Sequence, residues 1–265
     1  MGKYLALVKN FFSSAIIKQA DIFGNILINI IQIWAVVLIW QTVYSPRLSF
    51  GGFTLTDTIL YYVVILLITF ATYTNTADYI SQNIKMGTLS QWLLRPTSIL
   101  LTELARSLGE QLYKLLILVP IYIIVFLTVY FLRIKTNISI LGIVLGGFFM
   151  IVGFLLNCLF EYTLSILAFW MDEVWSIKHF KEVVTDLLGG KRAPLAFFPV
   201  IIQNINKFLP FQFIYFIPAE YMLGKHTVRN FVGDMSLLLL WLMFFIAVSK
   251  ILYDQGIRKY GAFGN

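Results

Sequence analysis

Charge is scarce in this chain. Asp, Glu, Lys and Arg together make up 12% of the 265 residues, roughly half the share found in soluble proteins, and residues 22–46 and 58–77 contain none. Apolar residues account for 59% of the chain, and the mean hydropathy is +0.83. Because a membrane-spanning helix needs about 20 mostly apolar residues, the sequence predicts an integral membrane protein.

Residues suited to metal and redox chemistry are also few. The single cysteine, Cys158, excludes an intrachain disulfide and a cysteine-rich metal site. The two histidines, His179 and His226, lie far apart, and neither has a companion at metal-ligand spacing. The phosphate-binding pattern G-x-x-x-x-G-K-[ST] is missing. We therefore predict no catalytic residue, no metal and no cofactor on this chain.

The formal net charge of +7 does not indicate a nucleic-acid-binding protein. The basic residues are scattered between apolar runs and form no basic, aromatic-studded domain that could bind phosphates. Cytoplasmic loops and acidic lipid headgroups explain this distribution better. Membrane lipids are therefore expected partners, and nucleic acid is not.

The apolar runs predict an all-α fold with transmembrane helices. We expect an amphipathic interfacial helix within residues 1–21, a transmembrane domain over 22–253 and a cytoplasmic tail over 254–265. Four prolines between 194 and 218 are incompatible with a straight span and predict re-entrant half-helices within 191–218. The clearest spans are about 22–44, 57–80, 114–132, 140–170 and 234–253.

The number of spans is not settled by charge. With six spans both termini lie inside, and the inner segments then carry more Lys and Arg than the outer ones, as expected. A five-span alternative would leave residues 172–233 inside and the tail outside. Within the fourth span, the Gly142-x-x-x-Gly146 spacing predicts a close helix neighbour.

Polar side chains occur inside several predicted spans. They either form hydrogen bonds between helices or contact a transported substrate. Glu161 is the most conspicuous, since a carboxylate at the bilayer centre costs roughly 2.5–3.5 kcal/mol and needs a partner, water or a proton. The candidate substrate-pathway residues are Asn25, Asn29, Gln32, Thr72, Asn75, Thr76, Asn157 and Glu161.

The most informative stretch is SQNIKMGTLSQWLLRP, residues 81–96. On a continuous helix its apolar residues would share one arc, flanked by Lys85 and Arg95, and Pro96 would end the helix. The stretch is either an ordinary connecting loop or a helix that docks on a soluble partner. The residues of the apolar arc are Met86, Leu89, Trp92 and Leu93.

The order of these parts resembles the permease subunit of ATP-binding-cassette (ABC) transporters of the type-two (ABC-2) exporter class, in the branch of multidrug and viologen efflux permeases. The resemblance covers about residues 4–261. Its most specific stretches are ISQNIKMGTLSQWLLRP at 80–96 and PLAFFPVIIQNINKFLPFQF at 194–213, supported by AFWMDEVW at 168–175 and the surface helix at 4–16.

The resemblance implies that 81–96 is a cytoplasmic coupling helix between spans 2 and 3, seated in a groove of a separate ATPase. It also implies six spans, with 194–218 as outward re-entrant helices before span 6. The chain departs from the family pattern by lacking a carboxylate near Asn83 or Met86. The implied ATPase-coupling residues are Gln82, Lys85, Met86, Leu89, Trp92, Leu93 and Arg95.

By the same resemblance, the chain is a non-catalytic membrane subunit that exports an amphipathic or cationic small molecule, drug or peptide. ATP and Mg would bind two copies of the partner ATPase, and a second permease, identical or homologous, would complete the pathway. The location would be the bacterial plasma membrane, with both termini cytoplasmic. The alternatives are an ion-coupled secondary carrier, which should show several intramembrane acids and an internal repeat, and a membrane-embedded enzyme.

Overall fold

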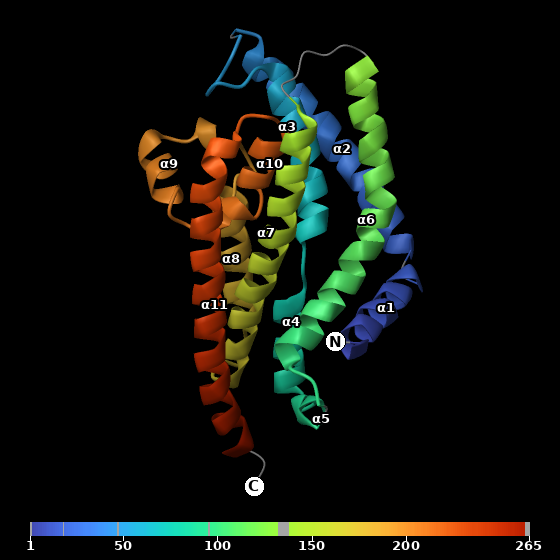
Figure 1. Ribbon diagram of the computed structural model, residues 1–265, viewed down its shortest axis with the longest axis vertical. Helices are drawn as coiled ribbons and strands as arrows, with labels where there is room; N and C mark the ends of the chain where they lie inside the picture. The colour runs from blue at the N-terminus through green and yellow to red at the C-terminus, as the bar shows by residue number, and fades with distance from the viewer. Residues whose placement is uncertain (1, 18, 47, 95, 132–137, 263–265) are drawn as a thin grey trace.

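The computed structural model describes residues 2–17, 19–46, 48–94, 96–131 and 138–262. In these segments all the named elements are helices, and most of them run along the long axis of one bundle (Figure 1). The fold class predicted from the sequence is therefore confirmed as all-α. The longer helices are α1 (Gly2–Ile17), α2 (Gln19–Tyr44), α3 (Leu55–Thr72), α6 (Ile99–Phe131), α7 (Ile140–Ile166), α8 (Trp175–Leu188) and α11 (Val228–Ala262).

Four stretches of the described chain are long and apolar enough to cross a membrane. They are residues 55–85, 99–124, 140–169 and 228–260, and a shorter apolar helix covers 31–44. The first of the four combines α3 with α4 (Thr76–Lys85), which follows after a short break in the helix. Three of these stretches agree with predicted spans, and 99–124 overlaps the predicted span 114–132 in part. By length and composition they indicate a multi-pass membrane protein.

The amino-terminal helix α1 packs against the first half of α6. A side chain at Gly109 of α6 would meet the backbone oxygen of Val8 at 2.6 Å, so only glycine permits this approach. The ammonium group of Lys3 donates a hydrogen bond to the backbone oxygen of Pro96, and the hydroxyl of Tyr4 accepts one from the amide of Ser98. The helix therefore holds the chain where it enters α6 (Figure 1).

At the upper end of Figure 1, short helices fold back between the long ones. They are η2 (Leu195–Phe197), α9 (Val200–Asn206), η3 (Phe211–Phe213) and α10 (Phe216–Met222). The close neighbour predicted for the glycines of the fourth span is α10: a Cβ atom on Gly142 would meet the Tyr221 oxygen at 2.5 Å, and one on Gly146 the Pro218 oxygen at 2.7 Å. Glycine thus lets α7 and α10 pack backbone to backbone.

The middle of the upper core is aromatic. The rings of Phe149 and Tyr221 stack with centroids 4.9 Å apart and an interplanar angle of 11°, and both side chains are fully buried. Phe53 and Tyr61 meet edge to face nearby, with centroids 5.9 Å apart. Aromatic pairs in these geometries stabilise a core beyond the area that they bury.

Helix α8 runs from the lower part of the bundle back to the upper short helices (Figure 1). Its charged side chains Lys178 and Lys181 are buried, whereas Phe180 and Val183 are 71% and 66% exposed. The helix is therefore oriented opposite to a helix of a soluble protein, with polar groups inside and apolar groups outside. This orientation is expected where the surroundings are lipid or another apolar surface.

One prediction of local structure was wrong. Residues 81–96 do not form one helix, because α4 ends at Lys85 and a turn with Gly87 at φ +74° precedes α5 (Leu89–Leu93). The start of α6 carries buried charge, since Glu103 and Arg106 are 1% and 6% exposed.

Candidate functional site: the coupling segment and its anchor

The segment predicted to dock on a partner forms the corner between α4 and α5, near the lower end of the bundle (Figure 1). We call residues 82–94 the coupling segment. Its outer surface carries Met86 and Leu94, which are 74% and 87% exposed, together with the exposed side chains of Gln82, Lys85 and Leu93. The corner therefore presents apolar and basic groups side by side.

The inner side of the coupling segment is fixed to the bundle. Leu89 is 2% exposed and packs in a cluster with Ile84, Tyr162 and Ile166. Gly87 is held from α11, because the hydroxyl of Tyr260 donates a hydrogen bond of 2.8 Å to its backbone oxygen. The segment is thus a braced corner, and of its predicted contact residues Leu89 faces inward.

Above the coupling segment, the backbone is interrupted between α3 and α4, at residues 73–75. Side chains from other helices bind the backbone groups that the interruption leaves unpaired. Asn157 of α7 donates to the Thr72 oxygen at 2.9 Å, and Gln111 of α6 donates to the Tyr73 oxygen. The amide of Ala77 donates to a carboxylate oxygen of Glu161 at 3.3 Å. Where water is excluded, backbone groups that lack a helical partner must form hydrogen bonds with side chains in this way.

Two lysines of α8 complete this arrangement. Lys181 forms an ion pair of 3.3 Å with Glu161 and a hydrogen bond of 2.5 Å with the amide oxygen of Asn157. Lys178 pairs with Asp78 at 2.5 Å and contacts the Asn75 amide oxygen at 3.2 Å. The carboxylate that needed a partner therefore has one, and α8 is joined to both α4 and α7. We call this set of contacts the charged joint.

Helix α6 contributes a second charged group on the other side of α4. Arg106 pairs with Glu103 and, at 2.7 Å, with Glu110, and its guanidinium lies 4.3 Å from the ring centroid of Tyr79 in α4. The hydroxyl of Ser107 lies 3.3 Å from that of Thr74 in the interruption. The first turns of α4 are therefore held by charged or polar groups of three helices.

The predicted pathway residues fall into two places. Thr72, Asn75, Thr76, Asn157 and Glu161 meet at the charged joint, where they bind one another, the backbone and the two lysines. Gln32 lies apart from them, in a groove of about 730 Å³ between α2 and α3 that ends at Lys191 and Arg192. The side chains of Asn25 and Asn29, and residue Arg95, lie outside the part of the chain that the structure describes.

Sequence reasoning missed Lys178 and Lys181. Their spacing of three residues, out of phase with Phe180 and Val183, could have indicated a helix with an internal polar face. The nearby acids Asp172 and Glu173 instead made the stretch resemble a solvated helix.

A separate acid lies near the upper end, on α10. Glu220 is 7% exposed, and its Oε1 atom has no hydrogen-bond partner within the described residues. Burial raises the pKa of this carboxyl from its ordinary value of 4.5 to about 7, although Lys225 partly opposes the shift. Lys225 itself pairs with Asp57 at 3.6 Å.

No group of three His, Cys, Asp or Glu side chains that could hold a metal ion occurs among the described residues. The arrangement contains buried ion pairs, a broken helix and an apolar corner.

The model of the family described as ABC-2 family transporter protein matches residues 28–264, nearly the whole chain. No curated protein matches the chain. The match does not specify a branch of the family. The chain belongs to the ABC-2 family of transporter proteins and is a membrane permease subunit of that class.

Proposed function

We propose that this permease is one half of the membrane part of an ATP-driven exporter, and that a separate ATPase docks on the coupling segment. The observation that carries the proposal is the two-sided character of that segment. Its outer apolar side chains, Met86 and Leu94, are largely exposed, while Leu89 anchors its inner side in the bundle. An exposed apolar surface on a braced corner is suited to receive force from a partner.

In this proposal the charged joint transmits the movement. A displacement of the coupling segment moves α4, whose first turn is tied to α8 through Lys178 and to α7 through Glu161. The interruption at 73–75 lets α4 tilt relative to α3. Two ATPase copies would close on ATP and Mg and drive this tilt, and the permease itself would hydrolyse nothing.

A second permease, identical or homologous, is proposed to complete the pathway. Helix α8 turns Phe180 and Val183 away from its own bundle, which supports an apolar contact with lipid or a sibling subunit. We take α2, α3–α4, α6, α7, α8 and α11 as six crossings. Helix α1 begins and helix α11 ends toward the lower end of Figure 1, which supports an even number of crossings and, in a bacterial plasma membrane, two cytoplasmic termini.

For the cargo we propose an amphipathic molecule, as exported by the multidrug and viologen branch. The groove lined by Gln32 has a volume within the range of small-molecule sites, and its walls are mainly apolar. Lys191 and Arg192 at its end favour an amphipathic cargo over a cationic one at this place. The ion-coupled carrier is less well supported, because Glu161 is neutralised by Lys181.

The test is affinity purification of the full chain in mild detergent. We expect an ATPase to be recovered in stoichiometric amount, and Met86→Asp or Leu94→Asp to release it, because each places a charge in the apolar contact. Leu48→Asp is the matched control, since Leu48 is 96% exposed but lies between α2 and α3, far from the coupling segment along the chain.

Recovery of the ATPase should be unaffected by the control. Equal loss with Leu48→Asp, or an autonomous proton-driven flux without any ATPase, would overturn the proposal and favour the carrier.

A further inference from the structure

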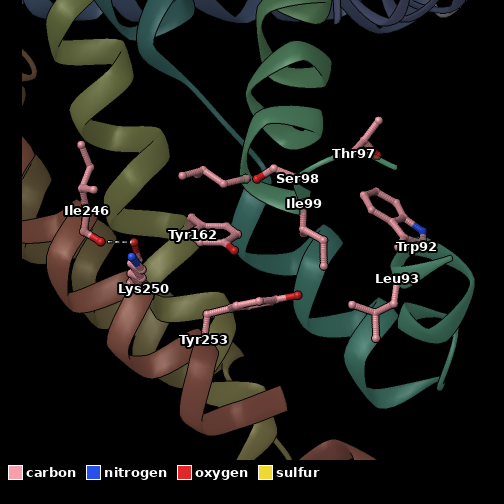
Figure 2. Close-up of a pocket in the computed structure, with 11 residues that line it drawn as sticks. Trp92, Leu93, Thr97, Ser98, Ile99, Tyr162, Ile246, Lys250 and Tyr253 are labelled. Carbon is pink, nitrogen blue, oxygen red and sulfur yellow. Dashed lines mark hydrogen bonds between the residues drawn. The ribbon is translucent and has the colours of Figure 1, made fainter. Parts of the chain in front are cut away.

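A pocket of about 320 Å³ opens beside the coupling segment (Figure 2). Its walls come from four parts of the chain: the coupling segment, the start of α6, the end of α7 and the lower part of α11. The proposed docking of the ATPase uses Met86 and Leu94, which do not line this pocket. The lining residues used below are Trp92, Leu93, Tyr162, Ile246, Lys250 and Tyr253.

Two tyrosine side chains line the pocket. Tyr162 is 5% exposed and Tyr253 is half-buried, and both belong to the pocket wall. Figure 2 shows the two rings extending from α7 and α11 with their hydroxyls toward Ile99 and the coupling segment. A tyrosine hydroxyl can both donate and accept a hydrogen bond, so two of them in one pocket wall can donate to an acceptor that enters the pocket.

The charge of the pocket is positive. Lys250 lies in its wall, and within the described chain it forms no ion pair. Residues 235–249 of α11 contain no charged side chain, so Lys250 is the first charge on the coupling side of this helix. A lysine at the end of an uncharged helical stretch lies at the level of the lipid headgroups.

We propose that this pocket binds the phosphate-bearing headgroup of an anionic phospholipid, with the Lys250 ammonium group on the phosphate and the hydroxyls of Tyr162 and Tyr253 donating to its oxygens. Basic pockets between transmembrane helices are suited to this chemistry. The acyl chains extend along α11, where Ile246 is 49% exposed beside the pocket and Met243 and Phe244 continue the exposed apolar surface.

A lipid in this place bridges two parts of the chain that are far apart in sequence. Its headgroup touches Trp92 and Leu93 of the coupling segment on one side and Lys250 of α11 on the other. Binding therefore restrains the coupling segment against α11. This inference goes beyond the proposed function and requires neither the ATPase nor a cargo.

The experiment uses the purified full chain, delipidated in detergent and titrated with phosphatidylglycerol or phosphatidylcholine, with bound lipid counted by native mass spectrometry. We expect one preferentially retained phosphatidylglycerol per chain. Lys250→Gln should weaken its retention about tenfold, because a hydrogen bond to a charged group contributes on that order. Tyr162→Phe, which keeps the ring, should weaken it about threefold for the loss of one neutral donor.

The matched control is Lys259→Gln, an exposed lysine of the same helix that does not line the pocket. It should change retention less than about twofold, because exposed charges are screened by salt. As a second readout, phosphatidylglycerol should slow amide hydrogen exchange over residues 88–98 in the unmodified chain and not in Lys250→Gln.

Three outcomes would overturn the proposal. Equal retention of phosphatidylglycerol and phosphatidylcholine would show that the charge of the headgroup does not matter for binding. Equal effects of Lys250→Gln and Lys259→Gln would indicate diffuse attraction to the basic tail. Slowing of exchange by inorganic phosphate alone, to the same extent as by the lipid, would assign the site to a free anion. None of these results depends on whether an ATPase docks on the coupling segment.

Discussion

The lower and upper halves of the bundle are held together by different interactions. In the lower half, buried charges meet at the charged joint, where Lys181 and Glu161 bridge two helices. In the upper half, α7 packs against α10 through glycines and through the stacked rings of Phe149 and Tyr221. The lower contact depends on each buried charge keeping its partner, whereas the upper contact depends on close backbone approach. The difference teaches that one bundle can hold its helices together by two kinds of chemistry, ion pairs in one half and glycine-mediated packing in the other.

The largest expected effect comes from breaking the charged joint. Glu161→Gln should lower the free energy of unfolding by about 3–5 kcal/mol, because Lys181 is left buried without its counter-charge. The measurement is thermal unfolding in detergent with a thiol-reactive fluorophore, since Cys158 is buried and becomes reactive only when the bundle opens.

The control for the joint is Glu173→Gln, an exposed acid at the same end of the molecule, which should change little. Adding Lys181→Met to Glu161→Gln should restore part of the lost stability. If the double variant is no more stable than Glu161→Gln, the ion pair does not account for the loss.

In the upper half, the pH dependence of stability should change with Glu220. Its folded-state pKa of about 7 lies above the ordinary 4.5, so the folded state binds the proton more tightly than the unfolded chain. The contribution of protonated Glu220 to the free energy of unfolding is fully present below pH 4.5. It is lost as the pH rises through 7, by about 3 kcal/mol in total. Glu220→Gln should abolish this fall in unfolding experiments between pH 4.5 and 8. An unchanged slope would contradict a buried, unpaired carboxyl.

Replacing a glycine of α7 by alanine should have opposite effects on stability on the two faces of the helix. Gly153→Ala is expected to destabilise the fold by about 1–3 kcal/mol, because the new Cβ atom would meet the Phe213 oxygen at 2.5 Å. Gly147→Ala in the same helix meets nothing within 4 Å, and it should stabilise by about 0.5–1 kcal/mol through helix propensity. Effects of the same sign would show that α7 and η3 do not pack as closely as described.

The smallest effect is expected at the start of α3. The Thr54 side chain accepts a hydrogen bond from the amide of Asp57, and the Asp57 carboxylate accepts one from the amide of Thr54. Thr54→Ala removes half of this capping box and should cost about 1 kcal/mol. Thr54→Ser keeps the hydroxyl and should be nearly neutral in the same unfolding assay; a loss equal to that of alanine would assign the effect to the methyl group.

Much of the fold follows from patterns that act over one helix. The long uncharged stretches predict the spans, and the Gly142 and Gly146 spacing predicts a close neighbour without naming it. The broken region at 194–218 follows from its prolines, since each one removes a helical hydrogen bond. These features depend on residues near one another in sequence.

Only one side of the charged joint could be predicted from the sequence. A carboxylate at 161 in an apolar run requires a partner, but Lys181 lies 20 positions further on, in a stretch whose acids suggest solvent. The inward position of Leu89 was not predictable either. The periodic arc of residues 86–93 assumes one continuous helix, and the positive φ of Gly87 turns the chain away from it.

The polar inner face of α8 has a consequence for how the protein is made. On the proposed six-crossing topology α8 enters the bilayer, where a lysine near the middle of a lone helix costs about 2.5–3.5 kcal/mol, and α8 carries two on that face. The segment is therefore a poor insertion signal by itself. Once α7 is in place, Glu161 and Asn157 offer Lys181 its contacts, so the two helices are expected to enter the membrane as a hairpin during synthesis.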